Sequence, residues 1–278
     1  MPAALTYAVG ALEVAFVGAG AFLLWRLVLS PGARASRPPA ALLPVNLAGI
    51  EVFVFLFLVT TASFLASALA AQLAGLARLN LGGEAAMIVN GAGAQLGMLA
   101  GAALFRLRVE RTAFLRNPLP AHVLRDGFVI FLISLPVVVV TGSAWEQLLR
   151  WLGLPVHKQD LVTLFANVGS PWLLAGMLVL AVVVAPVTEE LVFRAGLFRL
   201  LRGRLPRWAA VLLPATVFAV MHVSWSTLQG LVSLAPLLAL AVLLSLAYER
   251  TGRIGTVIVA HACFNLNTVG VILAGFTP

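Results

Sequence analysis

The chain has 278 residues, of which 62% are hydrophobic and 10% are charged, and its mean hydropathy is +1.05. A soluble domain carries about 25% charged residues, so this composition excludes a soluble globular protein and predicts an integral membrane protein. The net charge of +8 does not indicate nucleic-acid binding, because the basic residues lie in short loops between hydrophobic runs. The single cysteine, Cys263, excludes an internal disulfide bond.

Eight hydrophobic segments are candidates for bilayer-spanning helices, which need about 20 apolar residues each. They predict an all-α, polytopic transmembrane helical bundle of about eight spans. We expect the bundle to form a single integral-membrane domain over residues 1–278. The eight segments are residues 5–29, 45–74, 85–105, 124–149, 171–200, 208–225, 229–249 and 254–275.

Basic residues alternate between the loops, which predicts the topology of the chain. Even-numbered loops hold only Arg78, Arg150 and Lys158. Cytoplasmic loops carry an excess of Lys and Arg, so we expect the odd-numbered loops in the cytoplasm and both ends of the chain on the other side. The odd-numbered loops hold Arg34, Arg37, Arg106, Arg108, Arg111, Arg116, Arg125, Arg199, Arg202, Arg204, Arg207, Arg250 and Arg253.

Small residues recur on the third predicted helix. Gly93, Gly97 and Gly101 are spaced four residues apart, and this spacing lets helix backbones approach closely in lipid. The pattern predicts tight packing against a neighbouring helix rather than chemistry.

Three short polar clusters lie inside hydrophobic segments in the second half of the chain. A charge in a bilayer costs at least about 2.5–3.5 kcal/mol on insertion scales, so such residues are rare and typical of functional sites. Two carboxylates, two imidazoles and an amide are groups that a hydrolytic site uses. The clusters therefore predict an intramembrane enzyme. They are Glu189-Glu190-x-x-x-Arg194, Phe218-x-x-x-His222 and His261-x-x-x-Asn265.

The first cluster separates into a base and a supporting pair. Side chains four residues apart share a helix face, so we expect Glu190 and Arg194 to pair, which lowers the cost of burying both. Glu189 is rotated by about 100° from Glu190. It has Phe193 four residues on and so lacks such a partner on its own helix. Glu189 is therefore the candidate general base.

The other two clusters each place a histidine beside a defined neighbour. Phe218 lies one turn before His222 and is expected to pack against it as a supporting residue. His261 and Asn265 share a helix face, so one helix presents an imidazole and an amide together. His222, His261 and Asn265 join Glu189 as candidate catalytic residues.

In this order the clusters resemble the three motifs of the CAAX-protease and bacteriocin-processing family of intramembrane proteases, also called Abi. This family includes the type II CAAX prenyl endopeptidases. Its pattern is Glu-Glu-x-x-x-Arg, then Phe-x-x-x-His, then His-x-x-x-Asn/Asp/Ser, and the chain satisfies each motif. The resemblance covers residues 124–276 as the expected protease core and leaves residues 1–105 as accessory N-terminal transmembrane helices.

The resemblance implies roles for the four candidate catalytic residues. Glu189 would activate a water molecule with the help of His222, and His261 with Asn265 would hold the oxyanion of the tetrahedral intermediate. These roles agree with a base that must reach the water and donors that must face the developing charge.

The family has also been classed as metalloproteases, so a zinc ion remains an alternative cofactor. Glu189, His222 and His261 are the candidate metal ligands, because two histidines and a glutamate suffice for a catalytic Zn²⁺. A metal-free reaction is favoured, since the helical zinc motif His-Glu-x-x-His is absent.

Other functions make different demands on the sequence. The chain has no Gly-x-Ser-Gly for a serine nucleophile, and its only aspartates, Asp126 and Asp160, are near a helix end and in a loop. Two alternatives stay open. One is a non-catalytic bacteriocin-immunity or scaffold protein with the same motifs, and the other is a proton-relaying transporter. We find no internal repeat of the kind that transporters show.

The expected partners are the lipid bilayer and a peptide or membrane-protein substrate, and no nucleic acid. The excess of Arg over Lys and the richness in Ala and Leu favour a bacterium with a GC-rich genome, and hence a bacterial plasma membrane. Expected substrates are a peptide precursor, a membrane-bound regulator or a C-terminal sorting helix rather than a prenylated protein.

Overall fold

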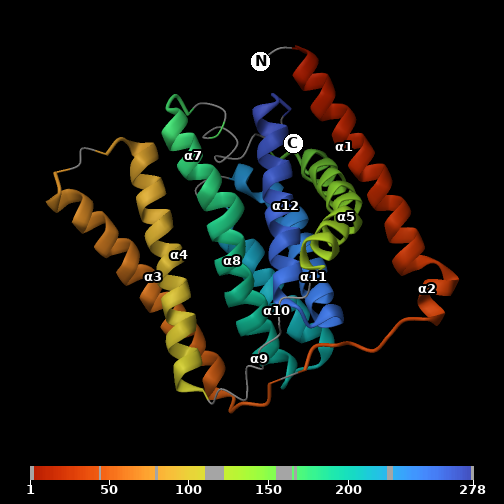
Figure 1. Cartoon of the computed structure of the whole chain (residues 1–278), viewed down its shortest axis with the longest axis horizontal. Coiled ribbons are helices and arrows are strands. Elements are labelled where there is room, and N and C mark those ends of the chain that lie inside the picture. The colour runs from red at the N-terminus through yellow and green to blue at the C-terminus, as the bar shows by residue number, and fades with distance from the viewer. Residues whose placement is uncertain are drawn as a thin grey trace. The chain divides into compact units, whose positions relative to one another are not determined.

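The computed structural model of the chain describes residues 3–43, 45–78, 81–109, 122–154, 165, 168–223 and 228–276. All the regular elements in these ranges are helices, shown in chain order in Figure 1. Seven of them are long and apolar enough to cross a membrane. The predicted polytopic helical bundle is therefore confirmed, and the chain is an integral membrane protein. The seven helices are Ala4–Leu29, Ile50–Leu76, Gly83–Arg108, Val123–Trp151, Pro171–Arg202, Gly230–Thr251 and Ile254–Leu273.

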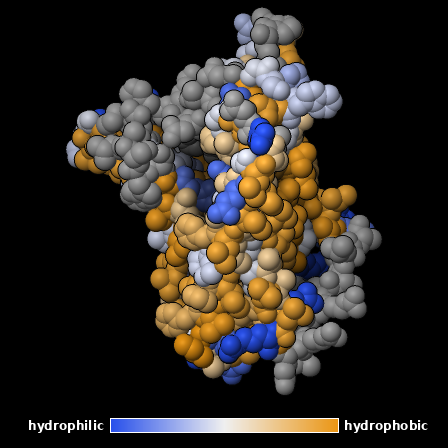
Figure 2. All heavy atoms as spheres, turned by 90° about the vertical axis from the view of Figure 1, so that its left-hand side faces the viewer, coloured by the Kyte–Doolittle hydropathy of each residue, from blue (hydrophilic) through white to orange (hydrophobic). Residues whose placement is uncertain are grey.

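Exposed apolar side chains suit these helices to lipid. Figure 2 shows one face of the molecule, on which hydrophobic residues form most of the surface and hydrophilic residues gather in separate patches. Among the large exposed side chains, Phe53, Phe57 and Phe64 all lie on α3 (Ile50–Leu76). Exposure of such side chains to water is unfavourable, whereas in a bilayer they contact the hydrocarbon chains of the lipids.

The second predicted helix begins later than the sequence pattern suggests. The prediction placed its start at residue 45, but α3 begins at Ile50. Arg199 Nε donates to Leu43 O at 3.2 Å, and Arg204 Nη2 donates to Leu47 O. These arginines bind carbonyl groups that a helix would use internally, so the apolar residues before Ile50 form a non-helical segment.

The sixth predicted span is the shortest of the eight. It corresponds to α10 (Arg207–Met221), which has 15 residues. At 1.5 Å per residue this helix is about 22 Å long, less than the bilayer's hydrocarbon core of about 30 Å. The last residues of the predicted span, 224 and 225, lie outside the described residues.

The helices fall into two compact units. The first unit contains residues 1–42, 119–167 and 215–278, and the second contains residues 43–118 and 168–214. The boundary between Pro214 and Ala215 lies inside α10.

Close contact between α3 and α4 (Gly83–Arg108) organises the second unit. A Cβ atom added at Gly93, Gly97 or Gly101 would come closer than 3.0 Å to backbone atoms of α3. The predicted role of this glycine series in helix packing is thus confirmed. On its other side α4 contacts the long helix Pro171–Arg202, so α4 is packed between two neighbours.

The first unit is built around α5 (Val123–Trp151), which packs against α1 (Ala3–Leu24), α11 (Leu234–Thr251) and α12 (Ile254–Leu273). Phe131 on α5 is 1% exposed, and its ring makes edge-to-face contacts with Phe16 of α1 and Phe264 of α12. Such aromatic pairs each contribute about 0.5–1.5 kcal/mol beyond the area they bury.

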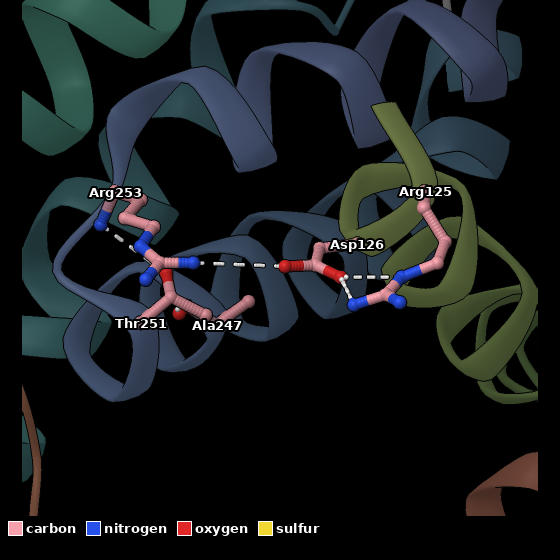
Figure 3. Close-up of polar contacts among 5 residues, drawn as sticks. All are labelled: Arg125, Asp126, Ala247, Thr251 and Arg253. Carbon is pink, nitrogen blue, oxygen red and sulfur yellow. Dashed lines mark hydrogen bonds and ion pairs between the residues drawn. The ribbon is translucent and has the colours of Figure 1, made fainter. Parts of the chain in front are cut away.

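Charged side chains tie the beginnings of α5 and α12 together (Figure 3). Asp126 in the first turn of α5 accepts two hydrogen bonds from Arg125, at 3.0 and 3.1 Å. Its second oxygen lies 3.7 Å from Arg253, the residue before α12. Both arginines are largely exposed, so this network contributes little to stability and serves mainly to set the ends of the two helices.

Candidate active site

The candidate residues divide between the two units. Glu189, Glu190 and Arg194 belong to the second unit, whereas the Phe218-to-His222 and His261-to-Asn265 clusters belong to the first. Each half of the site is described within its own unit.

The predicted pair of Glu190 and Arg194 is present and completely buried. Arg194 Nη1 donates to Glu190 Oε1 at 2.8 Å, and the side chains of Arg194 and Glu190 are 1% and 0% exposed. A buried ion pair does not by itself stabilise a fold, but removing one partner leaves a buried charge at a cost of about 3–5 kcal/mol. These two residues therefore form a rigid structural element next to Glu189.

The helix that carries the carboxylates departs from α-helical geometry on both sides of them. It consists of five consecutive segments, and Glu189 and Glu190 end the central one. The two flanking segments are π-helical, with the wider i to i+5 hydrogen bonding that is frequent at functional sites. The segments are α7 (Pro171–Val179), η3 (Leu180–Val184, π), α8 (Ala185–Glu190), η4 (Leu191–Phe198, π) and α9 (Arg199–Arg202).

Glu189 has a partner that the sequence did not identify. Gln95 Nε2 on α4 donates to Glu189 Oε1 at 3.2 Å, and Glu189 is 7% exposed. The prediction of Glu189 as the base considered only its own helix, and Gln95 adds a neutral hydrogen-bond partner from α4. The signal in the sequence was a lone amide between Gly93 and Gly97 in a predicted span, because polar residues there are costly and often functional.

His222 lies just beyond α10 rather than within it. The helix ends at Met221, and the backbone N–H of His222 still bonds to Ala219 O at 3.1 Å, which tightens the last turn. Its Nδ1 lies 2.7 Å from Phe218 O. A carbonyl only accepts hydrogen bonds, so Nδ1 donates this one, and in a neutral ring the lone pair then lies on Nε2. The side chain is exposed.

Phe218 lies against both histidines of the first unit. Its ring centroid is 4.2 Å from that of His222 and 6.0 Å from that of His261, and Phe218 is 1% exposed. The predicted packing of Phe218 beside His222 is confirmed. The contact with His261 brings the second and third clusters together, although 39 residues separate the two histidines in sequence.

His261 and Asn265 lie in the middle of α12 (Ile254–Leu273). His261 is 3% exposed, and Asn265 is half-buried one turn further along the helix. Nitrogen donors of both side chains can therefore lie on one face of α12.

The candidate metal ligands Glu189, His222 and His261 are distributed over both units. A hydrogen bond from one ring nitrogen to a backbone carbonyl, as His222 makes to Phe218 O, is common in metal-binding histidines and leaves Nε2 as the ligand atom. No group of three or more His, Cys, Asp or Glu side chains within the described ranges is arranged to hold a metal ion. His222 can thus serve either in proton transfer or as a ligand.

Comparison with protein families supports the resemblance. A family model described as "Type II CAAX prenyl endopeptidase Rce1-like" matches residues 171–267, which contain all three polar clusters. Residues 171–267 are thus similar to this family, and we call them the Rce1-like region. The Rce1-like region begins at Pro171, where α7 begins, and ends within α12, two residues after Asn265. It supports an intramembrane protease of the CAAX type. No curated protein and no solved structure matches the chain.

Proposed function

We propose that the chain is an intramembrane endopeptidase that hydrolyses a peptide bond with a water molecule activated by Glu189. His222 assists this activation, and His261 with Asn265 stabilises the oxyanion. The observation that carries the proposal is the contact of Phe218 with both histidines, inside a domain that resembles a prenyl endopeptidase. A structural role alone would not require imidazoles from two separate segments around one ring.

The reaction begins when water attacks the carbonyl carbon of the scissile bond. Glu189 takes a proton from the water as the C–O bond forms, and the carbonyl oxygen becomes an oxyanion. His261 and the amide of Asn265 donate hydrogen bonds to this oxyanion. When the intermediate collapses, the C–N bond breaks and Glu189 returns its proton to the leaving amine, which regenerates the carboxylate.

The hydrogen bond of His222 Nδ1 to Phe218 O suits the assisting role. We propose that the ring is neutral, so that Nε2 carries the lone pair and accepts a hydrogen bond from water. The same nitrogen would bind zinc in a metal-dependent reaction, in which the metal would polarise the water or the carbonyl. We propose the metal-free reaction and give its test in the Discussion.

The substrate class we propose is a peptide precursor or a membrane protein cleaved within or at the edge of a bacterial plasma membrane. Profiling of protein termini tests this directly. Membrane proteomes of cells that carry the wild-type chain or Glu189→Gln at equal levels are compared for new N- and C-termini. We expect termini that appear only with the wild-type chain.

The same set of termini in both strains would contradict the proposed protease. That result, combined with an unchanged protective or assembly phenotype in Glu189→Gln, would identify a non-catalytic immunity or scaffold protein. Proton-coupled uptake that is lost in Glu189→Gln would identify a transporter.

A further inference from the structure

A residue outside the Rce1-like region contacts the candidate base. Gln95 lies on α4, and its Nε2 donates to Glu189 Oε1 at 3.2 Å. Both residues belong to the second unit. The orientation of the amide follows from chemistry, because the reverse orientation would place two acceptor oxygens against each other.

The glycine series of α4 explains why Gln95 points at the long helix. Gly93 and Gly97 face α3, and a residue two positions from either is rotated by about 200° on an α-helix. Gln95 therefore lies on the side of α4 opposite α3. Ile88 and Gly91 precede it at i−7 and i−4 on this side and lie close to Gly176 and Leu180. One face of α4 thus runs along the helix that carries Glu189.

The second polar atom of Gln95 has no partner among the described residues. Its Oε1 is buried and receives no hydrogen bond from the residues that the structure describes. Buried polar atoms are nearly always hydrogen-bonded, so an orphan acceptor beside a catalytic carboxylate needs an explanation. A water molecule held against Glu189 has two hydrogens, and a carboxylate oxygen and an amide oxygen can accept one each.

We propose that Gln95 is a positioning residue for hydrolysis. Its Nε2 fixes the orientation of the Glu189 carboxylate. Its Oε1 accepts a hydrogen bond from the water that Glu189 deprotonates. As the water attacks, one proton passes to Glu189, and the second remains on the new hydroxyl group, held by Gln95 Oε1. This inference rests on the proposed function, and it assigns part of the site to the N-terminal helices.

Substitution of Gln95 by methionine tests the proposal. Gln95→Met keeps the length of the side chain and removes both polar groups. Asn90→Leu is the matched control, because it makes the same kind of change on an exposed amide of the same helix. The full-length variants are purified in detergent. The probe is an internally quenched peptide that spans the cleavage site identified by terminus profiling.

We expect kcat of Gln95→Met to fall by about 10- to 100-fold, the effect of one hydrogen bond to a charged group, with KM nearly unchanged. Gln95→Asn, which keeps the amide one methylene shorter, should recover part of the loss. Asn90→Leu should match the wild type, and the melting temperature should change little in all three variants.

Wild-type kcat in Gln95→Met, with Glu189→Gln inactive, would overturn the role of Gln95 and leave the proposed protease intact. A lower melting temperature with normal kcat per folded molecule would show a purely structural role, which also contradicts the proposal. Full activity of Glu189→Gln would instead remove the proposed function, and the role of Gln95 with it.

Discussion

The ring of Phe218 lies edge-on to the imidazole of His261, with centroids 6.0 Å apart and ring planes at 73°. The same ring stacks at a tilt of 33° on His222. One apolar side chain therefore sets the positions of two groups that we assign to catalysis. An aromatic residue suits this role because its flat face and its edge can each contact a different partner.

Replacement of Phe218 by leucine should lower kcat more than it lowers stability. Leucine preserves most of the buried volume, so we expect a loss of about 1–2 kcal/mol in the free energy of unfolding. Both imidazoles lose their packing surface, so kcat should fall at least tenfold. The control is Phe131→Leu, an equally buried phenylalanine of the same unit whose ring packs on other phenylalanines, among them Phe16 and Phe264. Equal kcat in the two variants would contradict the positioning role.

Replacement of Arg194 by alanine should destabilise the protein strongly. It leaves Glu190 buried without its salt-bridge partner, at an expected cost of about 3–5 kcal/mol. Arg150 is a matched control, because it pairs with Glu146 at the same i, i+4 spacing. The side chains of that pair are 56% and 33% exposed, against 1% and 0% for Arg194 and Glu190. Exposed helix pairs contribute about 0.3–0.5 kcal/mol, so Arg150→Ala should melt like the wild type.

Thermal melting in detergent measures both variants. If Arg194→Ala keeps its melting temperature but loses cleavage, Arg194 acts directly on the substrate rather than through Glu190.

Replacement of Gly97 by alanine should weaken the contact between α3 and α4. Alanine favours a helix by up to about 1 kcal/mol over glycine. The added Cβ would meet backbone atoms of Ala62 and Ser63, however, and overpacking costs about 1–3 kcal/mol. The melting temperature of Gly97→Ala should therefore fall. An added Cβ at Gly75 on α3 would meet no described atom within 4 Å outside its own turn of helix, so Gly75→Ala should melt at or above the wild-type temperature. An unchanged melting temperature in Gly97→Ala would show that α3 and α4 can move apart without a loss of stability.

Asn265→Ala should slow cleavage by about 10²–10³-fold without abolishing it, which is the usual effect of removing one oxyanion donor. Asn267→Ala, on the same helix two residues further on, is the control and should cleave normally. Glu189→Gln should be slower than Asn265→Ala, because the base has no substitute. If Asn265→Ala cleaves more slowly than Glu189→Gln, the assignment of Glu189 as the general base is wrong.

Removal of metal ions should leave activity in place. The purified protein is extensively chelated, analysed for metal content and assayed before and after zinc is added. Stoichiometric zinc, with activity lost on stripping and restored on addition, would make the metal-dependent reaction correct and Glu189, His222 and His261 its ligands.

The sequence predicts local features of this protein well. The bundle of apolar helices, the Glu190–Arg194 pair, the packing of Phe218 on His222 and the glycine series on α4 all follow from the composition or the period of a helix. Each depends on residues within a few turns of one another or on hydrophobicity alone.

Features that depend on contacts between distant segments could not be predicted. Gln95 meets Glu189 across 94 positions of sequence, and the helical period of either segment carries no sign of the other. The late start of α3 at Ile50 depends on Arg199 and Arg204, which bind carbonyl groups more than 150 residues away. The π-helical segments keep the hydrophobic pattern of an ordinary span, so composition alone does not distinguish them.

The π-helical segment Leu191–Phe198 gives this helix a tolerance in length. Glu189 and Glu190 lie just before it, and Arg199, which binds the carbonyl of Leu43, lies just after it. An i to i+5 turn holds one residue more than an α-helical turn, so deletion of one residue inside the segment would return it to α-helical hydrogen bonding with its two ends nearly in phase. The carboxylates and Arg199 would then keep their neighbours. Deletion of one residue from an α-helical stretch would instead rotate everything beyond it by about 100°.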